Sequence, residues 1–252
     1  MSSRRKPRRR AQVYSIKTVV ELLALVDKLE LVGDAIAFRG QGQRWPLVPD
    51  IGRPPFLQQG IGYDHWIDFE EDLLNKFKKL SHPFIAERSK SDWDWLYIAR
   101  HHGLPTRLLD WSTNPLKGLF FAVQDFRHDD KDSVLWAIQA SVWMETMESK
   151  KRGAVEDMLL VYPPHINERI VAQDGCFTVF PMPPDHGDFV PAERTRLVTR
   201  TVEVVIPAKA RRRLRAELVS LGLTHRTMFP GLDGVARAIR QEFGEGWLEE
   251  TN

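Results

Sequence analysis

Cysteine is nearly absent from this sequence of 252 residues, which contains a single one, Cys176. One cysteine excludes an intramolecular disulfide and any zinc site that needs two thiolates. The sequence also lacks an uninterrupted apolar run of the roughly 18–20 residues that a helix needs to span a bilayer. The basic N-terminus is not followed by an apolar segment, so we expect no secretory signal, no membrane partner and a cytoplasmic location.

Familiar catalytic motifs are missing as well. The sequence contains no Walker loop, no dinucleotide-binding glycine fingerprint, no Gly-x-Ser-x-Gly elbow and no metalloprotease helix. Cys176 falls in a segment that we expect to be a buried strand, which argues against a catalytic thiol. His101 and His102 are adjacent, and adjacent side chains rarely share one ion with good geometry. We therefore expect no metal site.

The net charge of +2 hides an uneven distribution. Residues 1–10 hold six cations and no acid, so the other 242 residues carry 30 cations against 34 anions. We expect residues 1–12 to be a disordered basic tail and residues 13–252 to form one domain. The tail is compatible with nucleic-acid binding through residues 4–10, and equally with a solubilising leader. A second group of cations over residues 209–215 is expected to be a solvated helix surface.

The apolar pattern predicts an α+β fold, with a helical N-terminal half packed on a mixed or antiparallel sheet. Helical spacing of apolar residues is present at 15–31, 66–80, 93–100, 116–125, 208–221 and 230–243. Short β-branched or aromatic segments that predict strands are present at 35–38, 133–138, 176–180 and 201–206. Glycines and prolines predict an irregular loop over 40–55, and 101–115 is expected to be a loop between two helices.

The first candidate site follows the strand at 35–38. Arg39 offers a planar fork of donors that suits phosphate or carboxylate. Gly40 would let a ligand or another segment approach the backbone, and Gln41 follows it. The alternative is structural, with Arg39 paired to a carboxylate such as Asp110.

The second candidate site is the segment 101–115, which holds His101, Thr106, Asp110 and Ser112. A histidine with a pKa near neutrality suits acid–base chemistry, and loops between rigid elements often carry function. The alternative is that Asp110 caps the following turn and that Arg107 ties the loop to the core.

The third candidate site is Gln173 and Asp174, just before Gly175 and a predicted strand. A glutamine there can recognise an amide or a ribose edge, although it is a poor general base. The alternative is a tight turn with Gly175 at positive φ.

These same stretches resemble the FRG domain family. The resemblance lies in Phe38-Arg-Gly-Gln, in His101-x-Gly-Leu-Pro-Thr-Arg-Leu-Leu-Asp-Trp-x-x-Asn-Pro-Leu, in Gln173-x-Gly-x-Phe and in Phe229-Pro-Gly-Leu-Asp-Gly. It extends over about residues 30–243. Three positions depart from the family's usual residues: Arg100 replaces a common Gln, His102 a common Tyr, and Asp50 a common Ser.

The resemblance implies a bacterial or phage-associated protein, and kinship of the FRG domain with ADP-ribosyltransferases would imply a fold of that type and NAD as cofactor. If the site of that enzyme class is carried over to this sequence, Arg39 with Gly40 and Gln41 would hold the NAD pyrophosphate. The residues that would line the pocket are Thr106, Asp110 and Ser112. The catalytic candidates are Arg39, His101, Gln173 and Asp174.

The same resemblance leaves the enzymatic status open. Gln173 cannot supply the negative charge that would stabilise a ribosyl cation, so the acid would be Glu168, Asp174 or Glu203. One reading is an NAD-using ADP-ribosyltransferase-like effector in a toxin or phage-defence context. The other is a non-catalytic nucleotide-sensing or interaction module. No protein partner is predicted.

Overall fold

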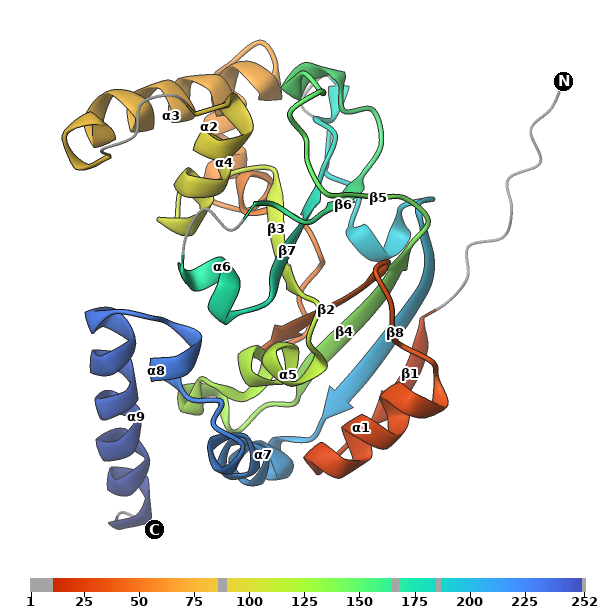
Figure 1. Cartoon of the computed structure of the whole chain (residues 1–252), viewed down its shortest axis with the longest axis vertical. Helices are drawn as coiled ribbons and strands as arrows, with labels where there is room; N and C mark the ends of the chain where they lie inside the picture. The colour runs from red at the N-terminus through yellow and green to blue at the C-terminus, as the bar shows by residue number, and fades with distance from the viewer. Residues whose placement is uncertain (1–10, 86–89, 165–167, 185–186, 251–252) are drawn as a thin grey trace, which may run out of the picture. The chain divides into compact units, whose positions relative to one another are not determined.

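The computed structural model describes residues 11–85, 90–164, 168–184 and 187–250. It confirms an α+β fold with a mixed sheet (Figure 1). The chain divides into a first unit (Met1–Trp45, Thr113–Ser141, Glu193–Asn252) and a second unit (Pro46–Ser112, Val142–Ala192). The expectation of one domain over 13–252 stays a prediction. Residues 4–10, proposed to bind nucleic acid, lie outside the described residues, whereas Gln12 of the expected tail already begins a strand.

The first unit contains four paired strands. In the order of the sheet they are β1 (Gln12–Ser15), β8 (Val198–Ile206), β4 (Ser133–Ala140) and β2 (Ile36–Gln41). β1 runs parallel to β8, and the other two pairings are antiparallel. Strands at 35–38, 133–138 and 201–206 were predicted from their β-branched and aromatic residues, and each is present. β1 was not predicted, because it is short and its side chains are largely exposed.

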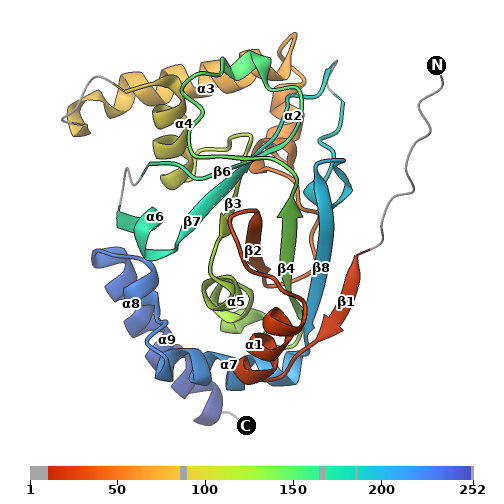
Figure 2. The ribbon, with the colours of Figure 1, turned by 45° about the vertical axis from the view of Figure 1, so that its right-hand side comes forward.

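Helices cover one face of these strands (Figure 2). The helices of the first unit are α1 (Val19–Lys28), α5 (Pro115–Val123), α7 (Ala208–Ser220), α8 (His225–Met228) and α9 (Leu232–Glu250). The core combines the inward faces of α1, α5 and α7 with alternate residues of β2, β4 and β8. Asn114 caps the start of α5, since its side chain accepts hydrogen bonds from the backbone N–H groups of Leu116 and Lys117.

The expectation of a solvated basic surface on α7 is wrong for two of its arginines. Arg211 and Arg215 are 0% and 4% exposed. Both contact the Asp129 carboxylate, and they donate to the carbonyl groups of Asp125 and Val123. These carbonyls lie at and just after the C-terminus of α5, where cations are stabilised by the helix dipole. The buried arginines therefore join α7 to α5.

The second unit contains the other four strands. In the order of their pairing they are β3 (Leu108–Ser112), β7 (Gly175–Val179), β6 (Leu159–Val161) and β5 (Trp143–Met144). Its helices are α2 (Phe56–Gly60), α3 (Trp66–Ser81), α4 (Asp92–His101) and α6 (Glu168–Ala172). The strand predicted at 176–180 is β7, and the helices predicted at 66–80 and 93–100 are α3 and α4. A core of aromatic and aliphatic residues joins α3 and α4 to β3, β6 and β7.

The segment 101–115 is not one loop, because residues 108–112 form β3. Leu108, Leu109 and Trp111 are buried, and the whole strand pairs antiparallel with β7. The turn that ends α4 contains Gly103, which has φ +85°. The backbone N–H of Gly103 donates to the carbonyl of Arg100, and the backbone N–H of Leu104 donates to the carbonyl of Ala99. These are the two hydrogen bonds of a Schellman motif.

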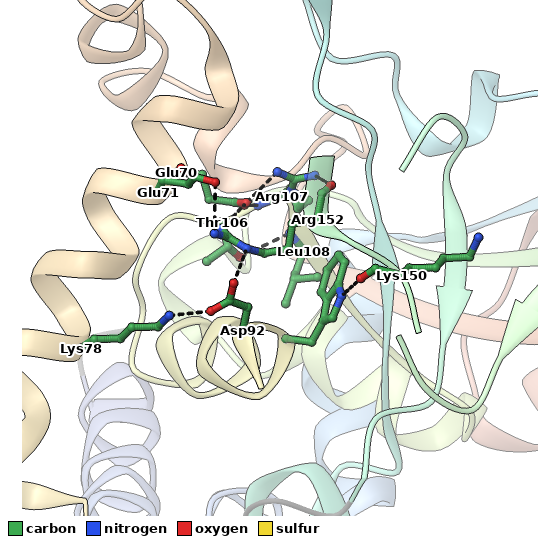
Figure 3. Close-up of polar contacts among 10 residues, drawn as sticks. Glu70, Glu71, Lys78, Asp92, Thr106, Arg107, Leu108, Lys150 and Arg152 are labelled. Carbon is green, nitrogen blue, oxygen red and sulfur yellow. Dashed lines mark hydrogen bonds and ion pairs between the residues drawn. The ribbon is translucent and has the colours of Figure 1, made fainter. Parts of the chain in front are cut away.

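A buried ionic cluster ties α3 to the start of β3 (Figure 3). Glu70 of α3 and Arg107 are each 1% exposed. Glu70 accepts from the backbone of Arg107 at 3.1 Å and from its Nε at 2.9 Å. Arg107 Nη1 donates to the carbonyl of Arg152, whose own guanidinium lies 3.4 Å from Glu70. The suggestion that Arg107 ties this segment to the core is confirmed.

None of the helices in the described residues combines the length and the apolar character that crossing a bilayer requires.

Candidate functional site

The second unit contains a cavity of about 180 Å³. Side chains and backbone from the start of the unit, the end of α4, β3, α6 and β7 surround it. The lining residues are Asp50, Arg100, His101, Gly103, Asp110, Trp111, Arg169, Ile170, Gln173, Gly175, Cys176 and Phe177. Three of the residues singled out from the sequence, His101, Asp110 and Gln173, therefore lie around one cavity.

The ends of two helices position the polar groups of the cavity. His101 is the last residue of α4, and the turn at Gly103 separates it from β3. Gln173 follows α6 and donates its backbone N–H to the carbonyl of Arg169 at 3.0 Å. The positive φ expected at Gly175 occurs instead at Asp174, with φ 45°, so the turn prediction was wrong by one residue. A short polar side chain tolerates this conformation better than most residues do.

One guanidinium binds both carboxylates of the cavity. Arg100 Nε donates to the Asp110 carboxylate at 3.1 Å and 3.3 Å, and Arg100 Nη1 forms an ion pair with Asp50. Burial by itself lowers the pKa of Arg100, but the charges of Asp110 and Asp50 outweigh it and raise the pKa. Arg100 is thus a permanent cation. Arg100 and Asp50 are two of the three departures from the FRG pattern, and they contact each other.

The pKa of His101, which lines the cavity, is shifted downward. Burial, followed by the charge of Arg169, lowers the pKa of His101 below its ordinary value. The His102 ring lies 4.8 Å away, and Arg169 donates to the His101 carbonyl at 3.5 Å. The imidazole is therefore neutral at pH 7 and can either donate or accept a hydrogen bond. In the described part of the chain, no group of three or more His, Cys, Asp or Glu side chains is placed to hold a metal ion.

Cys176 lies in β7 and is fully buried, which confirms the prediction of a buried strand. Burial, followed by the charge of Asp110, raises the pKa of the Cys176 thiol. A protonated thiol is a poor nucleophile, so Cys176 contributes to the cavity wall as an apolar group.

Three predicted residues of this unit do not line the cavity. Thr106 is fully buried, and its hydroxyl accepts from the backbone of Leu108 at 3.3 Å. Ser112 is also buried, and its hydroxyl donates to the Gln173 carbonyl at 2.7 Å. Asp174 lies at the turn described above. Ser112 therefore acts on the cavity through the segment that carries Gln173.

Arg39, Gly40 and Gln41 belong to β2 in the first unit. In the sheet register Arg39 is opposite Trp136 of β4, and Trp136 is opposite Glu203 of β8. Gln41 lies on the same face as Arg39, and its Oε1 accepts from Trp136 Nε1 at 3.0 Å. The structure thus gathers Arg39, Gln41 and Glu203 on one face of the sheet.

Glu203 is almost fully buried, at 2% exposed. Its partner is Arg44, whose Nη2 lies 2.7 Å from the carboxylate and whose side chain is 67% exposed. The Arg44 guanidinium carbon also lies 5.9 Å from the centre of the Trp136 ring. Gly40 lies on the opposite face, against the backbone of α5, so the close approach it allows is by another segment of the chain.

Several site residues were missed from the sequence. Arg169 was not among the residues singled out from the sequence, and Asp50 was noted only as a departure from the FRG pattern. A cation four residues before Gln173, a spacing that puts both on one side of a helical turn, is a signal that could have drawn attention to Arg169. Trp136 lies inside an apolar strand, where the sequence gives no sign that its ring nitrogen binds a polar side chain.

This geometry defines an α+β protein with a polar cavity in one of its two units. Residues 34–131 match the family model described as the FRG domain, so this part of the chain is an FRG domain. The matched range includes Phe38-Arg39-Gly40 and the whole segment 101–115. Searches of curated proteins and of solved structures each returned no match.

Proposed function

We propose that this FRG-domain protein binds a nucleotide at the cavity of the second unit, with NAD as the first ligand to test. One observation carries the proposal. His101, Asp110 and Gln173 come from two separate parts of the sequence, and they line a single cavity together with Arg100 and Arg169. A concave site in which several polar groups converge is the ordinary form of a small-molecule site.

The chemistry of the lining suits the parts of a nucleotide. The Gln173 side chain both donates and accepts, as recognition of a carboxamide or a base edge requires. The Arg169 guanidinium suits a phosphate. The volume of about 180 Å³ is below the ~300 Å³ at the lower end of sites for drug-sized ligands. The cavity would therefore hold the nicotinamide or base end of the ligand, with the remainder outside it.

The charges favour binding without turnover at this cavity. Stabilising a ribosyl cation requires a carboxylate whose negative charge is available to the ligand. Asp110 pairs with Arg100, and Asp50 pairs with both Arg100 and Arg53, so a cation opposes the negative charge of each carboxylate. We therefore propose a nucleotide-sensing role for the second unit.

Calorimetry with NAD, ADP-ribose, nicotinamide and ATP tests the binding proposal. We expect Gln173→Ala and Arg169→Ala each to weaken binding of the preferred ligand by about tenfold or more, because each removes a hydrogen-bonding partner in a partly buried site. Glu168→Ala is the matched control, since Glu168 is exposed on the same helix and is not part of the lining. Absence of binding by all four ligands, or an equal loss with Glu168→Ala, would contradict the proposal.

A second candidate function is ADP-ribosyl transfer at the first unit. The register Arg39–Trp136–Glu203 favours it, because it puts a guanidinium and a buried carboxylate on one sheet face. Arg39 would hold the NAD pyrophosphate and Glu203 would stabilise the cationic ribose. Arg44 pairs with Glu203 through a largely exposed side chain, which a ligand can displace at little cost. An enzyme of this kind would be an effector in a toxin or phage-defence context.

Incubation with labelled NAD and cell extract tests the second candidate. We expect Glu203→Gln to lower label transfer by about 100-fold, because the neutral side chain cannot stabilise positive charge. Arg200→Gln is the matched control on the opposite face of the same strand, and it should leave transfer unchanged. Expression of the wild-type chain should slow bacterial growth, and Arg39→Ala should relieve this. If the wild-type chain neither transfers label nor consumes NAD, the second candidate fails.

A further inference from the structure

Helix α9 carries an apolar stripe that no described part of its own unit covers. Leu232, Val235, Ile239 and Phe243 are 86%, 39%, 50% and 71% exposed. Their spacing of three, four and four residues puts them on one face of the helix. Isolated exposed apolar residues are normal on a protein surface, but an aligned row of four marks a contact surface.

The opposite face of α9 is the one that packs on its own unit. Gly234 is buried, and a Cβ there would lie 1.7 Å from the Phe229 carbonyl oxygen. Gln241, seven residues later, has its Oε1 2.6 Å from Nδ1 of His225 in α8. α8 lies beside α9 in both ribbon views (Figures 1 and 2). Since Gly234 and Gln241 face α8, the stripe of Leu232 and Ile239 points away from it.

We infer that the stripe is a self-association surface on which α9 of a second copy packs in the antiparallel direction. A twofold axis near Arg237 would put Leu232 opposite the partner's Phe243, and Val235 opposite the partner's Ile239. Every apolar residue of the stripe then meets an apolar residue. An isologous contact of this kind closes on itself and gives a dimer.

The charges beside the stripe favour binding of a second copy with its α9 in the antiparallel direction. Asp233 and Arg240 are seven residues apart, so they lie on the same flank, and both are exposed. In the antiparallel pair, this flank of one helix meets the same flank of the other helix. Arg240 of each copy then lies opposite the partner's Asp233, so the opposite charges meet at two symmetric places. On the other flank, Glu242 comes opposite the N-terminus of the partner helix, where the helix dipole favours an acid. The surface is thus complementary to itself in shape, polarity and charge.

Sedimentation velocity of the full chain over a range of concentrations tests the inference. We expect a dimer that dissociates on dilution, and we expect Ile239→Glu and Phe243→Glu to remain monomeric throughout. Val219→Glu is the matched control, because Val219 is 51% exposed on α7 and lies outside the stripe. A wild-type chain that is monomeric at every concentration overturns the inference, as does a dimer that Ile239→Glu leaves intact.

Charge exchange tests the antiparallel direction. Asp233→Arg and Arg240→Asp should each weaken the affinity of the dimer by about tenfold, because each variant puts like charges opposite one another at both symmetric contacts. The double variant Asp233→Arg/Arg240→Asp restores opposite charges and should recover the dimer. Far-ultraviolet circular dichroism checks that α9 is retained in each variant. If the double variant is as weak as the worse single variant, the proposed pairing is overturned.

Discussion

Glu70→Ala is expected to lower the free energy of unfolding by about 3–5 kcal/mol. Glu70 and Arg107 are each 1% exposed, and the carboxylate accepts two hydrogen bonds from Arg107. Arg107 Nη2 also lies 2.7 Å from Glu70 Oε2, although without hydrogen-bond geometry. Removing the carboxylate leaves the Arg107 guanidinium in a buried site, with the guanidinium of Arg152 beside it. An uncompensated buried charge is among the most destabilising changes known in proteins.

Glu71→Ala is the matched control for this prediction. Glu71 is the next residue of α3 and lies 3.4 Å from Arg152, but its side chain is 50% exposed. Water and salt screen such a pair, so we expect Glu71→Ala to cost less than about 1 kcal/mol. Urea denaturation gives both values, and hydrogen exchange of α3 and β3 locates the loss. Equal losses for the two variants would contradict a role for burial.

Replacing both partners of the buried pair separates charge from packing. Glu70→Leu/Arg107→Met removes both charges while retaining most of the side-chain volume. We expect it to recover most of the stability lost in Glu70→Ala, because no buried charge is left without a partner. This outcome would show that Arg107 of the 101–115 segment serves the fold of the second unit, apart from the neighbouring cavity.

The helices were the part of the fold most accessible from sequence. The predicted range 66–80 corresponds to Trp66–Ser81, and 208–221 corresponds to Ala208–Ser220. Periodic apolar residues and end signals act within a few residues of the positions they affect, so no tertiary information is needed. The cap at Asn114 and the helix stop at Gly103 are of the same local kind.

The errors arose where distant residues decide the outcome. Leu108–Ser112 was predicted to be part of a loop, because two polar residues in five and no β-branched residue give a weak strand signal. Its pairing with β7, more than sixty residues later, makes it a strand. Likewise Arg211 has the sequence context of an exposed helix, and its burial depends on Asp129, 82 residues earlier.

The candidate site was predictable in its residue types but not in its grouping. His101, Asp110 and Gln173 were identified because polar residues cluster near predicted helix and strand ends, and they do line one cavity. The sequence did not indicate that Arg100 binds both carboxylates, since nothing local relates Asp50 to Asp110. The sequence also did not show which of the candidate acids Glu168, Asp174 and Glu203 shares a sheet face with Arg39. The strand register puts Glu203 on that face.

Gly40→Ala is expected to cost about 3 kcal/mol or more of the stability of the first unit. A Cβ at Gly40 would lie 2.1 Å from the Gly118 carbonyl oxygen and 2.3 Å from the Ala122 nitrogen. Both are backbone atoms of α5, so no side-chain rotation relieves the overlap and the helix itself must shift from β2. Phe38, on the same face, belongs to the core that α5 covers, so the shift disturbs that core as well.

Gly42→Ala is the matched control, because it lies two residues away and meets only the His128 ring, at 3.7 Å. Ordinary contact of this kind should leave the free energy of unfolding within about 0.5 kcal/mol of the wild-type value. Urea denaturation of the two variants compares them directly. Equal stabilities would contradict the close crossing of β2 and α5. The expected difference assigns separate roles within Phe38-Arg39-Gly40: Phe38 and Gly40 fix the packing of α5, and that packing holds β2 so that Arg39 points to the opposite face.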